Sequence, residues 1–88
     1  MKSRTTPEFW ARYGRLPTEI QNLADRGYQT WVANPRHPSL QFKKLKGRDR
    51  LYSARVGDHY RAVADFDGEV FVWTWIGSHE EFNKLMRL

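Results

Sequence analysis

The stretch YRAVADFDGEVFVWTWIGSHEEF, residues 60–82, decides the fold because it contains two apolar runs, a tight turn between them and a charged end. Asp67 and Gly68 form one of the strongest short-range signals for a β-hairpin turn, so the flanking runs, 60–66 and 69–76, are predicted to be its strands. The second run is almost entirely apolar, which is typical of a central strand covered on both faces. The hairpin therefore predicts the centre of a sheet.

The position of the turn also predicts the register of the hairpin. Counting outward from it gives four opposed pairs: Phe66 with Glu69, Ala64 with Phe71, Ala62 with Trp73, and Arg61 with Thr74. Directly opposed residues share a face of the sheet, and small alanines opposite large aromatic rings leave room for helices to pack there. The face expected to be covered by helices carries Tyr60, Ala62, Ala64, Phe71, Trp73 and Trp75.

A third strand is predicted over LYSARV, residues 51–56. A three-residue turn to the next strand pairs Arg55 with Arg61 and keeps Arg55 out of the helix-covered core, whereas a two-residue turn would bury it. Two unpaired arginines directly opposed would repel each other. Either an anionic ligand lies over them, or Asp65 or Glu69 forms a salt bridge with them.

The N-terminal half predicts two helices. In TTPEFWARYGRL, residues 5–16, Thr6 is a suitable N-cap and Pro7 fits the first helical position. The preceding residues, 2–5, are expected to form a short edge strand.

The second and longer helix is predicted within LPTEIQNLADRGYQTWVANP, residues 16–35, with Thr18 and Gln21 as a capping box. Gly27 inside it weakens the helix by about 1 kcal/mol relative to alanine. Its apolar face is expected to carry Ile20, Leu23, Ala24, Tyr28, Trp31 and Val32.

The other end of the chain predicts a short closing helix over residues 79–87. Ser78 and Glu81 have the S-x-x-E spacing of a capping box. Together these elements predict an α+β fold, in which an N-terminal helical hairpin packs on one face of a small, mainly antiparallel twisted sheet. The sheet is expected to have three to four strands, and residues 1–88 to form a single domain.

Composition narrows the class of protein. The chain is 40% hydrophobic and 15% aromatic, which is too apolar for a disordered protein. It has no cysteine, so it can use neither disulfides nor thiolate chemistry. No stretch is long and apolar enough for a membrane span, and the N-terminus lacks the apolar centre of a signal peptide. A cytoplasmic protein with no membrane partner is expected.

The charge balance points to a polyanionic partner. Lysine and arginine number 15 against 10 acidic residues, which gives a formal net charge of +5. One basic segment stands out, with Lys43, Lys44, Lys46, Arg48 and Arg50. It is either a solvated loop or an arm that contacts nucleic-acid phosphates.

Taken in order, the helical hairpin, FKKLKG, YSARVGDHYRAV, the Asp-Gly turn and VFVWTWIGSHEEF resemble the RelE/ParE superfamily of bacterial toxins, the toxin halves of type II toxin–antitoxin pairs. The resemblance extends over about residues 8–86. It implies a RelE-like fold and a cognate antitoxin as partner. Many members are ribosome-dependent mRNA endonucleases that need no metal or other cofactor, whereas a sister branch inhibits DNA gyrase and cleaves nothing.

The resemblance also implies roles for individual residues. Arg61 matches the arginine that holds phosphate, and Arg55 matches a basic position of the preceding strand. His79 follows a glycine as the basic catalytic residue does in the nucleases, nearest to the YafQ-like pattern, which makes it the general acid. Phe82 matches the aromatic residue that positions a base or packs the site. His37 lies near a position that carries a catalytic His or Glu, but no glutamate occupies the position of the general base.

These residue types suit cleavage of RNA by its own 2′-hydroxyl. The reaction needs charge stabilisation at phosphorus and a proton for the 5′-oxygen that leaves, which arginine and histidine supply. The capping box of Ser78 and Glu81 also explains the segment without any chemistry of His79. Two other functions stay open: a ParE-like gyrase inhibitor or catalytically inactive binding protein, and a small basic RNA-binding domain without toxicity.

Overall fold

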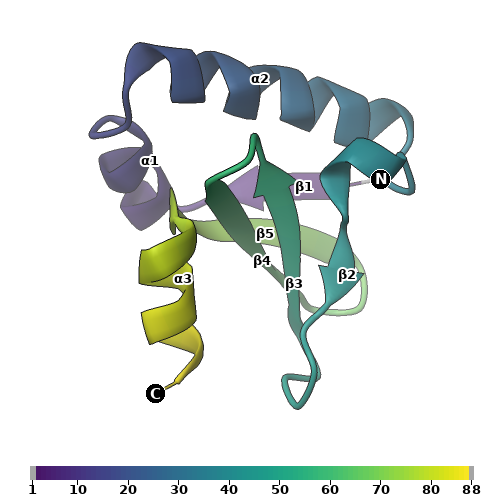
Figure 1. The fold of residues 1–88 in the computed structure, drawn as a ribbon. Coiled ribbons are helices and arrows are strands. Elements are labelled where there is room, and N and C mark those ends of the chain that lie inside the picture. The colour runs from purple at the N-terminus through teal and green to yellow at the C-terminus, as the bar shows by residue number, and fades with distance from the viewer. Residues whose placement is uncertain (1, 88) are drawn as a thin grey trace.

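The computed structural model describes residues 2–87, which form a five-stranded mixed sheet and three α-helices (Figure 1). The elements are β1 (Lys2–Thr5), α1 (Pro7–Tyr13), α2 (Thr18–Ala33), the 3₁₀ turn η1 (Pro38–Leu40), β2 (Lys43–Lys44), β3 (Leu51–Val56), β4 (Tyr60–Phe66), β5 (Val70–Ser78) and α3 (His79–Met86). The strand order is β1-β5-β4-β3-β2, with β1 parallel to β5 and the other neighbours antiparallel. The predicted α+β fold is confirmed. β1 is the predicted edge strand, and the short β2 is a fifth strand beyond the three to four that were expected.

The two helices of the N-terminal half begin in different ways, since a side chain caps α1 and none caps α2. The Thr6 hydroxyl accepts a hydrogen bond from the Phe9 backbone N–H, as predicted for the N-cap of α1. The capping box predicted for α2 is wrong, because Thr18 is itself the first helical residue and no side chain caps that end. The Gln21 amide donates instead to the Tyr13 carbonyl oxygen (3.0 Å) and ties α2 to α1.

Only part of the apolar face of α2 is buried against the sheet. Trp31 is 1% exposed and lies at the centre of the core, whereas Tyr28 and Val32 are 46% and 49% exposed. These two residues are four positions apart and form one flank of the apolar stripe. The predicted apolar face therefore includes a flank that lies outside the buried core.

The three-residue turn between β3 and β4 is confirmed, and it pairs Arg55 directly with Arg61. Gly57 begins this turn with a φ of +61°, which favours glycine. A Cβ atom there would also lie only 2.9 Å from Leu23 Cδ1, so the turn packs closely against α2.

The predicted register of the β4–β5 hairpin is wrong by two residues at the turn. The observed pairs are Phe66 with Phe71, Ala64 with Trp73, Val63 with Trp75, Ala62 with Ile76, and Arg61 with Gly77. The turn is wider than a two-residue loop because Asp67 accepts hydrogen bonds from the backbone N–H groups of Glu69 and Val70 through its side chain.

An irregularity between Val63 and Ala64 changes the register a second time and leaves Thr74 without a partner on β4. Beyond this β-bulge the faces of β5 are exchanged. Trp75, predicted to face the helices, shares the opposite face with Arg61, and Ile76 takes its place in the core.

The main core lies between the sheet and the α1–α2 layer. Its buried members are Phe9, Trp31, Leu40, Ala54, Val56, Ala62, Ala64, Phe71, Trp73 and Ile76. α3 packs against the other face, where Phe82 contacts Trp75 and Arg61. Among the described residues, no helix is both long and apolar enough to cross a membrane.

Candidate functional site

Two arginines face each other on the sheet face away from α1 and α2, as the sequence predicts. Arg55 on β3 is paired across the strands with Arg61 on β4. The guanidinium of Arg55 forms an ion pair with Asp58 in the adjoining turn and donates from Nε to the Gly57 carbonyl oxygen (2.8 Å). Local ion pairing therefore offsets the charge of Arg55.

The two acidic residues expected to neutralise this pair have other partners. Asp65 accepts from Nε of Arg50 (2.9 Å), and Glu69 lies 3.6 Å from the ammonium group of Lys2. The prediction of a salt bridge from Asp65 or Glu69 to the opposed arginines is therefore wrong.

Arg61 turns toward the start of α3. Its Nε–H donates a long hydrogen bond of 3.4 Å to Nδ1 of His79, and its Cζ lies 5.5 Å from the centre of the Phe82 ring. Partial burial lowers the pKa of Arg61 below its ordinary value, and the positive charge of Arg55 lowers it further. An anion bound here would offset both effects, so the position suits a phosphate group.

His79 is the first residue of α3, and its backbone is fixed from two sides. Its N–H donates to the His59 carbonyl oxygen (2.7 Å), and the predicted capping box is present, with Ser78 Oγ accepting from the Glu81 N–H and Glu81 Oε1 accepting from the Ser78 N–H. The side chain itself is exposed. Because Nδ1 faces Arg61, Nε2 lies on the far side of the ring, where a substrate can reach it.

Phe82 forms the floor of this cluster. It is 8% exposed, and its ring centre lies 6.3 Å from that of His79 and 6.3 Å from that of Trp75. So small an exposed area suits packing beneath the histidine better than stacking on a nucleobase. The β-bulge supplies the second aromatic wall, because it brings Trp75 to this face.

Arg12 of α1 also reaches this region, and the sequence gives no signal for it. Its Nε–H donates to the Ile76 carbonyl oxygen (2.8 Å), its Nη2 lies 3.0 Å from Oε2 of Glu81, and its Cζ stacks 4.7 Å from the Trp75 ring centre. Arg12 therefore joins α1 to β5 and to the first turn of α3. A polar cavity of about 240 Å³ lies here, lined in part by Gly77 and Ser78, the residues that precede His79.

The basic segment is a hairpin that runs from β2 into β3. Lys43, Lys44 and Lys46 are exposed, and Arg50 is engaged with Asp65 as described above. Arg48 donates from Nη2 to the Met86 carbonyl oxygen (3.3 Å), which places the hairpin beside the last turn of α3. α3 therefore begins with His79 and has the basic hairpin beside its last turn, on the same face of the sheet.

Comparison with known proteins identifies the family. A family model described as the ParE-like toxin domain matches residues 18–84, most of the chain. The chain belongs to the ParE-like toxin family. No curated protein matches it.

Solved structures share the fold of this ParE-like chain at low sequence identity. The RelB–RelE antitoxin–toxin complex from Methanococcus jannaschii contains a chain that is 18% identical, with a TM-score of 0.74 over 92% of this chain and 95% of that one. YafQ from Escherichia coli strain BL21(DE3) is 9% identical, with a TM-score of 0.74 over 92% and 96%. The YoeB/ParE toxin from Agrobacterium tumefaciens is 19% identical, with a TM-score of 0.71 over 90% and 99%. These structures confirm the RelE-like fold.

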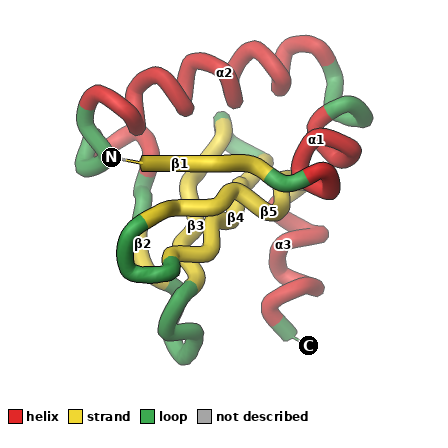
Figure 2. Tube along the Cα trace, turned by 180° about the vertical axis from the view of Figure 1, so that it is seen from behind, coloured by secondary structure: helices red, strands yellow, loops and turns green. Residues whose placement is uncertain are grey.

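In this ParE-like chain, His37 is not brought to the cluster. Its Nδ1 accepts from the Ser39 backbone N–H (3.2 Å) and lies 2.8 Å from the Ser39 hydroxyl, so its ring caps the η1 turn. η1 follows the end of α2 that is remote from α1 and α3, as the two opposite views show (Figures 1 and 2). Residues 2–87 contain no group of three or more His, Asp or Glu side chains placed to hold a metal ion.

Proposed function

We propose that this chain is the toxin of a toxin–antitoxin pair and cleaves mRNA on the ribosome without a metal ion. The observation that supports this function best is the contact between Nε of Arg61 and Nδ1 of His79 (3.4 Å) on an exposed face, with Arg55 opposite. A permanent cation and a titratable ring lie side by side, as transfer of a phosphoryl group to a neighbouring hydroxyl requires.

In the proposed reaction the 2′-oxygen of a ribose attacks the adjacent phosphorus, and the bond from phosphorus to the 5′-oxygen breaks. The products are a 2′,3′-cyclic phosphate and a free 5′-hydroxyl. Arg61, supported by Arg55, stabilises the negative charge that grows on the phosphate oxygens. His79 acts in its imidazolium form, in which Nδ1 also carries a proton and no longer accepts from Arg61, and it gives the proton on Nε2 to the leaving 5′-oxygen, which leaves a neutral imidazole. The cluster thus supplies the acid and the cations, and the base that accepts the 2′ proton is not one of its three side chains.

The basic hairpin has a separate role in this proposal. Its exposed lysines lie away from the reacting atoms and hold the phosphate backbone, so they contribute affinity rather than chemistry. An acidic antitoxin is the physiological partner that we propose, because a net charge of +5 favours an anionic protein as well as RNA. The archaeal structures with the same fold are antitoxin–toxin complexes, which supports this partner.

Inhibition of gyrase without cleavage is the second candidate. The ion pair between Arg55 and Asp58 favours it, because it offsets the charge of one of the two arginines that would bind phosphate. The lack of a glutamate at the position of the general base also favours it.

A direct experiment separates the two functions. Purified protein is added to ribosomes translating a defined mRNA, and in parallel to DNA gyrase supercoiling a relaxed plasmid. We expect mRNA fragments with 5′-hydroxyl ends and unchanged supercoiling. Intact mRNA together with blocked supercoiling would show that the nuclease proposal is wrong.

A further inference from the structure

A second histidine, His59, lies opposite His79 at the end of the β4–β5 pairing. The backbone N–H of His79 donates to the His59 carbonyl oxygen (2.7 Å), which continues the pairing one step beyond Tyr60 and Ser78. Directly opposed residues of an antiparallel pair have Cβ atoms about 4.5–5.5 Å apart. The two imidazole rings therefore branch from neighbouring points of the backbone.

His59 lies on the same face of the sheet as Arg61. Side chains alternate between the two faces along a strand, so residues two positions apart share a face. Arg61 follows His59 by two positions and lies on the face of α3, where its guanidinium contacts the His79 ring (3.4 Å). Because the backbone pairing extends to His59, this alternation places its side chain beside the arginine and the histidine of the candidate site.

Nothing in the turn requires a histidine at this position. Within the turn, residues 57–59, only Gly57 has a positive φ, so the backbone at His59 suits most residues. The contact with His79 uses the backbone carbonyl, which every residue has. The His59 side chain is exposed, and within residues 2–87 it has no hydrogen-bond or ion-pair partner. The imidazole is therefore free to take a proton from a bound molecule.

Three carboxylates on this face of the sheet are engaged elsewhere. Asp58 forms an ion pair with Arg55, and Asp65 forms one with the basic hairpin. Glu81 takes part in the capping box of α3 and also accepts from Arg12. Ion pairs and hydrogen bonds of this kind stabilise the ionised form of a carboxylate, which makes it a poorer acceptor of a proton.

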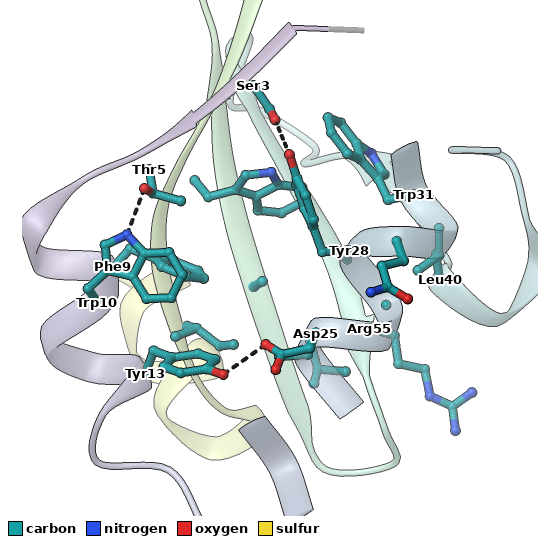
Figure 3. Close-up of a pocket in the computed structure, with 18 of the residues that line it drawn as sticks. Ser3, Thr5, Phe9, Trp10, Tyr13, Asp25, Tyr28, Trp31, Leu40 and Arg55 are labelled. Carbon is teal, nitrogen blue, oxygen red and sulfur yellow. Dashed lines mark hydrogen bonds between the residues drawn. The ribbon is translucent and has the colours of Figure 1, made fainter. Parts of the chain in front are cut away.

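The opposite face of the sheet is also unsuited to supply the base. It carries a cavity of about 510 Å³ between α1, α2 and the sheet (Figure 3). Asp25 is the only carboxylate among the described residues that line this cavity, and it accepts from the Tyr13 hydroxyl (2.8 Å), as Figure 3 shows. The sheet lies between this cavity and His79, so the base must come from the face of α3.

We propose that His59 is the general base that accepts the proton of the 2′-hydroxyl, so that two histidines flank the reacting phosphate. This assignment rests on the proposed function, because it names the base that the reaction still lacks. Neutral His59 takes the 2′ proton as the 2′-oxygen bonds to phosphorus, and the bond from phosphorus to the 5′-oxygen breaks as His79 protonates that oxygen. His59 ends as imidazolium and His79 as neutral imidazole, so the protons balance.

The leaving group of the substrate distinguishes a base from an acid. In one of two synthetic mRNAs, sulfur replaces the bridging 5′-oxygen at the cleaved linkage. Thiols are far stronger acids than alcohols, so the sulfur leaves as a thiolate without being protonated. Cleavage of this mRNA therefore needs the base and not the acid.

Single-turnover cleavage of both mRNAs on ribosomes is measured with full-length wild type, His59→Ala and His79→Ala. We expect each variant to cleave the ordinary mRNA about 10²–10⁴-fold more slowly than wild type. The sulfur should restore most of the rate of His79→Ala and none of that of His59→Ala. Thermal melts show that both variants are folded.

Glu80→Gln is the matched control, because Glu80 is an exposed carboxylate next to His79 with no ion pair among the described residues. It should keep the wild-type rate on both mRNAs. A His59→Ala protein that cleaves ordinary mRNA at the wild-type rate, or whose cleavage the sulfur restores, would overturn the assignment and leave the proposed function standing. Wild-type protein that cleaves neither mRNA would overturn both.

Discussion

The close packing around Gly77, just before His79, requires a residue without a side chain. A Cβ atom there would lie 2.8 Å from Cη2 of Trp75 and 2.9 Å from Oε1 of Glu81, both closer than real contacts allow. The strand can therefore pass between the Trp75 ring and the capping box only if this residue is glycine. The glycine that the RelE-like pattern places before the catalytic residue thus has a steric reason in this chain, independent of catalysis.

Replacing Gly77 by alanine should therefore lower the free energy of unfolding by about 1–3 kcal/mol, the usual cost of overpacking. Gly14→Ala is the matched control, since a Cβ there would lie no closer than 3.4 Å to any atom, with the carbonyl oxygens of Trp10 (3.4 Å) and Ala11 (3.8 Å) as its neighbours, and the φ is −63°. That variant should be neutral or more stable by about 0.4–1 kcal/mol. Urea unfolding of both proteins measures the difference, and equal stabilities would show that Gly77 is not sterically required.

At the scale of elements, α3 is held at its first turn by a carboxylate. Hydrogen bonding from the Ser78 backbone N–H is the main cause that lowers the pKa of Glu81 below its ordinary value of 4.5, with a further contribution from Arg12. A pKa that is lower in the folded state stabilises the fold while the carboxylate is ionised. This contribution is present above the unfolded pKa and is lost as the pH falls through the lower folded value.

Glu81→Gln should accordingly lower Tm at about pH 6, and the deficit should shrink as the pH falls through the lowered pKa of Glu81, because the wild-type carboxylate then becomes protonated. Glu80→Gln removes a charge from the same turn without touching the capping box, and it should change Tm less. Melts by circular dichroism across this pH range make the comparison. A Glu81→Gln deficit that is constant with pH would rule out the carboxylate as the stabilising group.

Some elements with local signals could be predicted from the sequence, although the capping box at Thr18 and the two-residue turn at Asp67–Gly68 were wrong. The Ser78–Glu81 capping box, the Thr6 cap and the three-residue turn that opposes Arg55 and Arg61 each depend on residues close in the chain. The bulge in the β4–β5 hairpin could not be predicted, because nothing local distinguishes Thr74 as the extra residue.

The predicted site shows the same division between local and distant contacts. Arg61, His79 and Phe82 come together because the hairpin and the following helix are adjacent in sequence. Arg12 was missed because it reaches Glu81 over 69 positions, a contact that only the packing of α1 creates. The resemblance places His37 near a catalytic position only by its order along the chain, and in the fold η1 follows the end of α2 that is remote from the cluster.

On the scale of the whole molecule, the sheet separates two regions. One face carries the α1–α2 layer with its large cavity, and the other carries α3, the arginine pair and the basic hairpin. A polyanion that reaches His79 can therefore also lie along the hairpin, whereas Arg26 lies on α2, which covers the opposite face of the sheet.

Charge on the hairpin should consequently matter more for RNA binding than equal charge elsewhere. Lys43→Ala/Lys46→Ala should reduce the slope of log binding constant against log salt concentration by about 1–1.5, with cleavage of bound RNA unchanged. Arg26→Ala/Arg36→Ala removes the same charge from exposed positions of the α2 region and should leave the slope nearly as it is. Binding measured at several salt concentrations decides this, and equal slopes for the two double variants would contradict a phosphate-binding hairpin.

In the proposed reaction His79 donates a proton and does not merely occupy a capped helix start. If it is the acid, His79→Ala should retain the wild-type Tm, because the side chain is exposed and Ser78 and Glu81 still cap the helix. Ser78→Ala should instead lose about 1 kcal/mol of stability with a small effect on rate. Arg61→Ala should slow cleavage at least as much as His79→Ala, since it removes the cation where negative charge develops.

Single-turnover cleavage of ribosome-bound mRNA, measured beside thermal melts of the same three variants, tests this claim most directly. We expect His79→Ala to be folded as well as wild type and to cleave about 10²–10⁴-fold more slowly, the usual contribution of one general acid. A His79→Ala protein that cleaves at the wild-type rate, with Ser78→Ala as the most damaged variant, would contradict it.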